Sequence, residues 1–570
     1  MTRYKIIFLP AGKTAEVEEG ETLLQAAEKA SVPVRSDCGG DGTCGKCRLR
    51  VVNGKAPSSP SSLLSDDDRK KGWVLACRTP VRSDITVEVP PESRREKKHR
   101  EETSRRFRDW SEETIPLKEI DPLVRKFSLS LPPPSLSDNL GDRERLVREI
   151  RKATRAKVVE VPLPVLRALA AVLRSNSWEV VATVARKESS LEILAVEGKA
   201  TAKKAYGAAI DIGTTTVVVH LVDLAAGKTV AAEAEFNSQI AFGEDVIKRI
   251  IRCEEAGVTK LAAVPSVPAR EAGLMIAAGA LLYSVPGIAS WVGGDITAGV
   301  LHSGMHRSED LALLVDIGTN GEIAVGNSEW LLACSCSAGP AFEGSGIACG
   351  TRAGAGAIDR FDFANDRSPT FRTIREEKPT GICGSGLIDL LSELFRTGHL
   401  GRDGRLNPSS DTKRIRMGEA GLEFVVAKAG ESGGGRDIVL TQADIDNLIR
   451  AKAAVYAGIS VLLKAVNLAP SDLKRLYISG GFGNYLNIRR AICLGLLPDL
   501  PPERIVFIGN GSVRGAKRIL LSRRAESEAR EIAKMMTYFE LSADNRFMEE
   551  FAAAMFLPHT NVELFPSCKK

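Results

Sequence analysis

The N-terminal part of the chain alternates between short apolar segments and polar turns, which is typical of a small domain built around a β-sheet. Residues 4–9 (YKIIFL) and 14–19 (TAEVEE) predict a β-hairpin, and residues 21–31 (ETLLQAAEKAS) carry apolar side chains at helical spacing. Further strands are expected at residues 47–52 (CRLRVV) and 84–89 (DITVEV). The glycine-rich segment between the helix and the third strand is expected to form a loop.

Polar segments divide the rest of the chain into further domains. Residues 92–110 hold eight Lys or Arg and five acidic residues with almost no apolar side chains, which is typical of a solvated linker. Such a basic tether would also suit an acidic partner. After the boundary sequence LPPPSLSDN (residues 131–139), two helical patterns and two strand-like segments predict a small α/β domain. We therefore expect a first domain at residues 1–91, a linker at 92–130, the small α/β domain at 131–204 and a last domain at 205–570.

An internal repeat opens the last domain. Residues 205–224 (AYGAAIDIGTTTVVVHLVDL) and 310–327 (DLALLVDIGTNGEIAVGN) both read as a strand, the sequence D-I-G-T and a second strand. Glycine and threonine in such a turn offer amide and hydroxyl groups to phosphate oxygens, and the Asp at the end of the strand can hold Mg²⁺ through water. One such turn is weak evidence because Asp and Gly are common in hairpins, but two that face each other would bind one nucleotide's phosphates from both sides.

Composition excludes several classes of function. The 570 residues are 44% hydrophobic, which predicts several domains with sizeable cores. A net charge of +6, from 78 Lys plus Arg against 72 Asp plus Glu, is too small on such a surface to favour nucleic acid. Residues 272–294 are uncharged, but Pro286 and several glycines interrupt them, so no membrane span is expected. The apolar run before Pro10 is too short for a secretory signal, which favours a cytoplasmic location.

The eleven cysteines are unevenly distributed, with a C-x5-C-x2-C array and a distant fourth cysteine near the N-terminus: Cys38, Cys44, Cys47 and Cys77. Glycines at positions 39, 40, 42 and 45 allow this loop to curl around an anionic cluster with its amide groups directed at the sulfurs. A zinc knuckle is the alternative, but the surrounding strands and helix count against it. The other seven cysteines are scattered, as small buried apolar residues are, and Cys568 is expected to be an exposed thiol in a flexible tail.

The strand pair, the helix, the cysteine loop and the late fourth cysteine resemble the ferredoxin domains that carry a [2Fe-2S] cluster. The resemblance covers roughly residues 3–90 and implies a β-grasp ferredoxin-like fold. It implies that Cys38, Cys44, Cys47 and Cys77 are the cluster ligands. The first gap has five residues where the plant-type spacing has four, and related ferredoxin branches share the longer gap.

The two D-I-G-T turns and the strand-to-glycine sequence RLYISGGFGNYLN (residues 475–487) resemble the phosphate and adenosine motifs of the acetate and sugar kinase, Hsc70 and actin superfamily. The resemblance implies a duplicated ribonuclease-H-like ATPase domain whose two lobes close on ATP. It implies that Asp211 and Asp316 lie on the Mg²⁺ side and that Glu322 orients the attacking water. An exposed strand position is the alternative for Glu322. The implied nucleotide contacts are Gly213, Thr214, Thr215, Thr216, Gly318, Thr319, Asn320, Gly321, Gly480 and Gly481.

The order of ferredoxin domain, linker, small domain and ATPase domain resembles the reductive activators of corrinoid-dependent methyltransferases. The resemblance implies an α/β multidomain, ATP-hydrolysing iron-sulfur protein that reduces the inactive Co(II) corrinoid to Co(I). The cofactors so implied are a [2Fe-2S] cluster, ATP and Mg²⁺. The partners are a corrinoid protein and an upstream low-potential reductant, and a homodimer is one option for the assembly. Four further strings resemble signatures of that family: WVGGDITAG (291–299), CSAGPAFEGSGI (336–347), TGICGSGLIDLL (380–391) and FIGNGSVRGA (507–516).

Other functions for the same motifs differ in what they require of the cysteines. An ATP-coupled donor to another low-potential enzyme, such as a dehydratase, would also use a cluster and ATP. An ATP-gated chaperone that exchanges a cofactor would tolerate loss of the cluster. A small-molecule kinase would not need four cluster cysteines, and a flavin reductase is disfavoured because no G-x-G-x-x-G turn opens a helix after a strand.

Two further expectations concern parts of the ATPase domain. The small residues of GICGSG (381–386) would let a flat corrinoid macrocycle approach closely, with Cys383 or Ser385 near the cobalt. The alternative is that Ser385 is only the N-cap of the following helix. The segment between residues 250 and 291 lacks the glycine-asparagine-threonine turn expected there, so the first ATPase lobe is expected to be shortened, which puts hydrolysis in doubt more than nucleotide binding.

Overall fold

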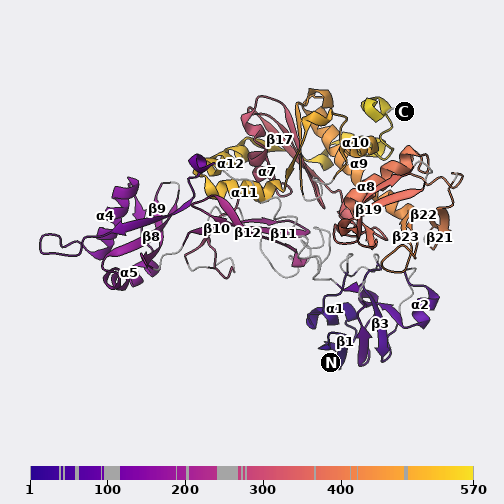
Figure 1. Ribbon diagram of the computed structural model, residues 1–570, viewed down its shortest axis with the longest axis horizontal. Helices are drawn as coiled ribbons and strands as arrows, with labels where there is room; N and C mark the ends of the chain where they lie inside the picture. Colours follow the sequence, from indigo (N-terminus) through magenta and orange to yellow (C-terminus); the bar gives the residue numbers. More distant parts are fainter. Residues whose placement is uncertain are drawn as a thin grey trace.

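Figure 1 shows a ferredoxin-like domain (indigo), a small α/β domain (violet) and a larger C-terminal part (magenta to yellow) in a computed structural model of the chain. Among the described residues, no helix has the length and apolar character needed to cross a membrane. The structure describes residues 2–36, 40, 42, 45–57, 63–90, 93–94, 116–187, 189–200, 204–239, 267–270, 274–276, 279–364, 368–410, 412–419, 421–480 and 486–568. The segment in which a shortened first lobe was expected lies mostly outside these residues.

The N-terminal domain is a five-stranded sheet with the strand order β2-β1-β5-β3-β4, in which β1 runs parallel to β5. This is the predicted β-grasp arrangement, and the predicted hairpin, helix and later strands are all present. The three-residue strand β4 and the short helix α2 were not anticipated. Alternate residues of β1, such as Ile6 and Phe8, are buried in the core of this domain, as period-two patterning requires. Its elements are β1 (Arg3–Leu9), β2 (Lys13–Glu18), α1 (Leu23–Lys29), β3 (Arg48–Asn53), α2 (Asp66–Lys70), β4 (Trp73–Leu75) and β5 (Ile85–Glu88).

The small domain has a four-stranded sheet with the order β6-β8-β9-β7 and two helices. Strand β6 (Val124–Ser130) pairs antiparallel with β8 along its whole length, so residues 124–130 are not linker as predicted. The prediction failed because Leu129 is the only fully buried residue of β6 and charged residues interrupt its apolar positions. The other elements are α4 (Asp142–Thr154), β7 (Val159–Glu160), α5 (Leu163–Ser175), β8 (Glu179–Arg186) and β9 (Leu191–Gly198).

The C-terminal part contains the two repeated hairpins predicted from the sequence. The first hairpin, β10 and β11, forms a three-stranded antiparallel sheet with β12. The second, β15 and β16, lies at the centre of a six-stranded sheet with the order β25-β24-β15-β16-β17-β26. The strands of these sheets are β10 (Tyr206–Ile212), β11 (Thr216–Asp223), β12 (Lys228–Phe236), β15 (Ala312–Ile317), β16 (Gly321–Gly326), β17 (Leu331–Cys336), β24 (Arg475–Ser479), β25 (Ile505–Gly509) and β26 (Met536–Tyr538).

Helices cover both faces of the six-stranded sheet. On β15, Leu313 and Val315 pack into the apolar cluster that contains α8 and α9, whereas Ala312 and Leu314 pack into the cluster with α7, α11 and α12. A central strand buried on both faces reads as a continuous apolar run, as ALLV does here. Because β15 and β24 are parallel neighbours, the turns that follow them lie at the same edge of the sheet. The helices are α7 (Gly294–Ser303), α8 (Gly384–Arg396), α9 (Gln442–Ala465), α10 (Ile488–Leu494), α11 (Gly511–Leu521), α12 (Arg523–Met535) and α13 (Asn545–Ala554).

Small sheets complete the C-terminal part. Strands β13 (Val267–Pro268) and β14 (Leu281–Leu282) form a short pair. The remaining strands form two three-stranded sheets, with the orders β19-β18-β20 and β21-β22-β23. These strands are β18 (Ala357–Phe363), β19 (Pro369–Thr373), β20 (Gly381–Ile382), β21 (Ile415–Gly418), β22 (Gly421–Ala427) and β23 (Ile438–Thr441).

The C-terminal segment is attached to the domain rather than free. Cys568 forms a disulfide with Cys493 of α10, so the prediction of an exposed thiol in a flexible tail is wrong. Nearby, Phe565 is buried among residues of the same core as α9. The buried Lys452 of α9 donates hydrogen bonds to the carbonyl oxygens of Phe556 and Pro558, at 2.6 and 2.7 Å. These contacts depend on residues far apart in sequence, which local patterns do not reveal.

Candidate nucleotide and cluster sites

The two D-I-G-T turns lie face to face. The hydroxyl oxygens of Thr215 and Thr319 are 2.7 Å apart, so the hairpins of the two repeats meet at their turns. In the first turn, the Gly213 amide donates to the Thr216 carbonyl, and in the second the Gly318 amide donates to the Asn320 carbonyl. Hydroxyl and amide groups of both turns therefore lie close together, and groups of these kinds bind phosphate oxygens.

Asp211 is the next-to-last residue of strand β10 and is bound by residues from the start of α11. The Asn510 amide donates to one of its carboxylate oxygens at 2.7 Å, and the Ser512 hydroxyl donates to the other at 2.9 Å. Burial raises the pKa of Asp211, and these two hydrogen bonds oppose the rise. The string FIGNGSVRGA resembles a family signature, but no local pattern in it predicts that Asn510 and Ser512 bind Asp211.

Asp316 is the next-to-last residue of strand β15 and accepts a hydrogen bond of 2.6 Å from the Ser479 hydroxyl at the end of the parallel strand β24. The same hydroxyl accepts a hydrogen bond from the Gly511 amide at 3.2 Å. Burial raises the pKa of Asp316 to about 7, and the negative charges of Asp295 and Asp211 add to the rise. The carboxylates of the two repeats are thus close enough to influence each other, and both are connected to α11.

Asp295 is a fourth carboxylate at this site, and the sequence analysis missed it. It lies in the first turn of α7 and raises the pKa of Asp211, Asp316 and Glu322 through its negative charge. A glycine pair followed by Asp at a helix start was the available signal. In the described part of the chain, no three His, Cys, Asp or Glu side chains form a group that could hold a metal ion. A divalent ion here would therefore need phosphate or water ligands as well.

Glu322 lies on β16 directly across from Asp316 in the antiparallel ladder. Burial raises its pKa well above the usual range, and the charges of Asp295 and Asp316 add to this effect. The alternative of an exposed strand residue is wrong, because Glu322 is half-buried and belongs to the same acidic group. A carboxyl group with a raised pKa beside a turn of Gly and Thr is suited to hold a water molecule or a proton.

The glycine that follows β24 permits the close contact between the two strands. Gly480 has a φ of +100°, and a Cβ atom at this position would lie 2.8 Å from the Asp316 carboxylate and from the Ile317 carbonyl oxygen. Gly481, the other predicted adenosine contact, lies outside the described residues. Asn237, which the sequence analysis did not identify, supports the first turn by donating to the Gly213 carbonyl at 2.9 Å.

Two of the four predicted cluster ligands are described, and they lie together. The sulfur atoms of Cys47 and Cys77 are 3.4 Å apart without a disulfide, and both residues are buried. Gly40, Gly42 and Gly45 have positive φ angles, as the predicted curled loop requires. Cys38 and Cys44 lie outside the described residues. Two converging buried thiols beside a glycine-rich loop fit a cysteine-ligated cluster.

The predicted corrinoid contacts lie at the start of α8. Helix α8 begins at Gly384, so Cys383 is its N-cap and the alternative assignment of Ser385 as the N-cap is wrong. The Cys383 thiol donates to the Ile358 carbonyl at 3.3 Å and lies 3.6 Å from the Ser385 hydroxyl. Both side chains are buried, with Ser385 6% and Cys383 1% exposed. A macrocycle could reach them only if neighbouring residues moved.

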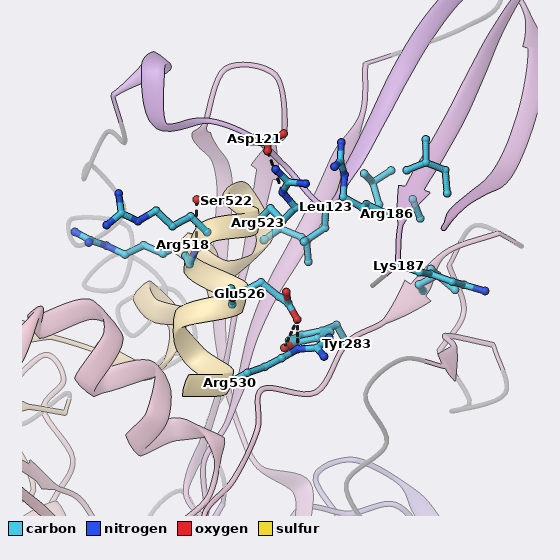
Figure 2. A pocket seen from close by; sticks show the side chains of 18 of the residues that line it. Asp121, Leu123, Arg186, Lys187, Tyr283, Arg518, Ser522, Arg523, Glu526 and Arg530 are labelled. Atoms are coloured by element: carbon cyan, nitrogen blue, oxygen red, sulfur yellow. Dashed lines mark hydrogen bonds and ion pairs between the residues drawn. The ribbon is translucent and has the colours of Figure 1, made fainter. Parts of the chain in front are cut away.

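A separate cavity of about 1690 Å³ lies between the small domain and helices α11 and α12. Figure 2 shows Arg186 and Lys187 of the small domain on one side and Arg518 and Arg523 on the other. The Arg523 guanidinium pairs with Asp121, another residue that lines the cavity, at 3.5 Å. None of the predicted nucleotide, cluster or corrinoid contacts that the structure describes lines this cavity, so it is distinct from those three sites.

Family models match most of the chain, from residue 7 to 82 and from residue 117 to 569 with short gaps. Residues 7–82 match the "2Fe-2S iron-sulfur cluster binding domain" family and residues 117–203 the "RACo linker region". Residues 206–264 and 258–308 match the "RACo middle region", and residues 310–569 match the "C-terminal domain of RACo the ASKHA domain".

Two relatives over nearly the full length and one over less than half of the chain agree with these family matches. A solved structure described as "Reductive activator for corrinoid,iron-sulfur protein" is 40% identical, covers 99% of this chain and 100% of its own, and has a TM-score of 0.73. "Corrinoid activation enzyme RamQ" of Eubacterium limosum is 27% identical over 619 residues, covering 96% of this chain and 98% of its own. The "[Co(II) methylated amine-specific corrinoid protein] reductase" of Methanosarcina barkeri is 26% identical over 44% of this chain and 46% of its own.

Proposed function

The chain belongs to the RACo family of reductive activators, and from this membership we propose that it transfers an electron to an inactive Co(II) corrinoid protein and restores Co(I), using ATP. The observation that carries the proposal is the presence in one chain of the converging Cys47 and Cys77 thiols and the paired D-I-G-T turns. A [2Fe-2S] cluster, when bound, supplies a single low-potential electron. A small-molecule kinase would have no use for the first feature, and a simple ferredoxin would have no use for the second.

The energetic reason for joining the two sites is an uphill electron transfer. Ferredoxin-type centres lie near roughly −400 mV. An acceptor about 100 to 200 mV more negative makes transfer unfavourable by roughly 2 to 5 kcal/mol, since 59 mV corresponds to a tenfold change for one electron. Conformational coupling energies in proteins are typically about 1 to 3 kcal/mol, so ATP-driven closure of the lobes is of the right size to offset much of this cost.

We assign roles at the nucleotide site from its geometry. Thr215 and Thr319 donate hydroxyl protons to phosphate oxygens from the two sides, together with turn amides. Asp211 and Asp316 hold Mg²⁺ through water, and a bound divalent ion would keep both carboxyl groups ionised despite their raised pKa values. Glu322 orients the attacking water, with Asp295 as the other nearby carboxylate.

The same proposal requires a reductant and a contact surface for the corrinoid protein. An upstream low-potential reductant must supply the electron that leaves the protein in each turnover. Thiolate-ligated clusters of low potential are maintained in reducing compartments, which supports a cytoplasmic location. The small residues around Cys383 and Ser385 are the proposed contact with the corrinoid, after local movement exposes them.

The experiment is anaerobic reduction of a Co(II) corrinoid protein. The reconstituted protein is reduced and mixed with the corrinoid protein, and the Co(I) absorption band is followed with and without ATP. We expect the band to grow only with ATP, and to be absent with Cys77→Ala. Growth of the band without ATP would contradict the proposed coupling. ATP hydrolysis without Co(I) from any corrinoid protein would favour an electron donor to another enzyme.

A further inference from the structure

A side chain of the loop before Cys47, in the ferredoxin-like domain, reaches the C-terminal part. Lys46, which precedes Cys47, donates a hydrogen bond of 2.8 Å from its ammonium group to the Ala348 carbonyl. A longer contact of 3.4 Å reaches the Ile347 carbonyl. Figure 1 shows the indigo domain beside the part of the chain that contains α8 and β21–β23, in agreement with these contacts.

The receiving loop, residues 344–350, has a fixed shape. Gly344 has a φ of +82°, and a Cβ atom there would lie 2.5 Å from the Thr351 carbonyl oxygen, so the loop closes tightly on itself. Helix α9 anchors it, because the Ala348 amide donates to the Asp444 carboxylate at 2.8 Å. Burial raises the pKa of Asp444, and the positive charge of Lys46 is one of the effects that oppose the rise. Lys46 therefore contacts the carbonyl oxygens of Ile347 and Ala348, and its charge also interacts with the Asp444 carboxylate.

The same loop is joined directly to the phosphate-binding turn. Glu343 ends a short 3-10 helix (Pro340–Glu343) immediately before the loop. The Thr319 hydroxyl donates to one Glu343 carboxylate oxygen at 3.1 Å, while the other oxygen is buried without a partner among the described residues. The Thr319 hydroxyl has a single proton, which it can give to Glu343 or to a phosphate, but not to both.

We propose that residues 344–350 are a nucleotide-controlled docking site for the chain's own [2Fe-2S] domain, occupied through Lys46 without nucleotide and released when phosphate displaces Glu343 from Thr319. This inference rests on the proposed nucleotide site. A phosphate at Thr319 takes its proton and brings negative charge against the Glu343 carboxylate, which has no counter-charge within the described part of the chain. Glu343 moves, and the adjoining loop moves with it because the close contact between Gly344 and Thr351 cannot absorb the displacement. Release frees the cluster domain to approach another protein.

The test compares the size of the holoprotein in solution with and without a non-hydrolysable ATP analogue, by small-angle X-ray scattering, while equilibrium dialysis measures binding of the analogue. In the wild type we expect the radius of gyration to increase when the analogue binds. Lys46→Ala should show the increased radius without nucleotide. Lys55→Ala, which replaces another exposed lysine of the same domain, should behave as the wild type. Glu343→Gln keeps an oxygen to accept from Thr319 but removes the charge, so it should bind the analogue and remain compact.

Each outcome separates docking from nucleotide binding. Analogue that binds to the wild type without changing its radius would overturn the proposed coupling and leave the nucleotide site standing. No binding at all would overturn both. If Lys46→Ala loses the visible absorption of the cluster, the radius of gyration of Asp444→Asn is measured instead. This variant disturbs the receiving loop and leaves the ferredoxin-like domain intact. If both Asp444→Asn and Lys46→Ala keep the small radius of the wild type without nucleotide, this docking contact is excluded.

Discussion

Gly480 has no side chain at the point where the end of β24 approaches Asp316. We predict that Gly480→Ala destabilises the nucleotide-binding part by about 1 to 3 kcal/mol and abolishes ATP binding, since the added Cβ atom would lie 2.8 Å from two oxygen atoms. Gly304→Ala is the matched control, because Gly304 also has a positive φ but a Cβ atom added there would have no neighbouring atom within 4 Å. It should lose only about 1 kcal/mol and keep ATP binding. Thermal unfolding and equilibrium dialysis give the two readouts, and equal behaviour of the variants would refute the steric argument.

Asp316, the proposed Mg²⁺-side carboxylate, lowers the stability of the folded chain at neutral pH. Its carboxyl group keeps a proton up to about pH 7 in the folded chain, because burial and the charges of Asp295 and Asp211 raise its pKa. The unfolded chain releases that proton near pH 4. The folded state therefore binds more protons between these values, so the free energy of unfolding falls as the pH rises from about 4 to about 7 and then stays low.

We predict that Asp316→Asn unfolds at a higher temperature than the wild type at pH 8 without nucleotide, while it fails to bind Mg²⁺-ATP. The Asn carbonyl oxygen still accepts the hydrogen bond from Ser479, so packing is kept. The gain is about 4 kcal/mol at most and should vanish as the pH is lowered toward 4. Asp310→Asn, at an exposed aspartate, should change neither property. A lower unfolding temperature for Asp316→Asn at pH 8 would show that the carboxylate stabilises the fold.

At the scale of elements, helix α10 is held from two sides. Arg490 pairs with Asp389 and Glu393 of α8 at 2.9 and 3.2 Å, and Cys493 joins the C-terminal segment by the disulfide to Cys568. A crosslink across 75 residues reduces the entropy of the unfolded chain by an amount equivalent to about 4 kcal/mol. Since the segment also contributes Phe565 to the core, loss of the crosslink should loosen it without unfolding the domain.

We predict that reductant lowers the unfolding temperature of the oxidised wild type by several degrees, and that Cys568→Ser shows the lower temperature with or without reductant. Disulfides are rare in reducing compartments, so a thiol count on anaerobically purified protein shows which form exists there. A wild type that is unaffected by reductant, although its thiol count shows the bond, would mean that core contacts alone hold the segment.

The sequence predicted those elements that are specified by residues close together in the chain. The repeated hairpins and the ferredoxin-like strands were predicted because their apolar residues alternate and their turns contain Gly, Thr and Asp. Strand β6 was missed because six of its seven residues are not fully buried, so its pattern reads as polar. The partners of Asp211 and the disulfide were missed because they join residues far apart in the chain. Sequence patterns thus located Asp211, Asp316, Glu322 and the converging Cys47 and Cys77, but not Asp295 or the groups that position these side chains.

At the scale of the molecule, the ferredoxin-like domain, the small domain and the C-terminal part have separate apolar cores. Effects at distant sites with no shared contacts are usually additive. We predict that Cys77→Ala abolishes the cluster absorption and Co(I) formation while ATP hydrolysis continues. Asp211→Asn should abolish ATP binding while the cluster keeps its spectrum and is still reduced. Complete loss of ATP hydrolysis in Cys77→Ala would show that the domains do not function as separable units.

The docking contact makes a quantitative exception to this independence. If nucleotide releases the ferredoxin-like domain, then docking must oppose nucleotide binding by the same factor, because the coupling free energy between two sites is reciprocal. Lys46→Ala, which lies far from the phosphate turns in sequence and in a different domain, should therefore bind the ATP analogue about 5-fold or more tightly than the wild type. Lys55→Ala should bind it with unchanged affinity. If the tighter binding of Lys46→Ala disappears in the double variant with Glu343→Gln, Glu343 connects the two sites. Equal affinities in all the variants would show that docking and nucleotide binding are independent.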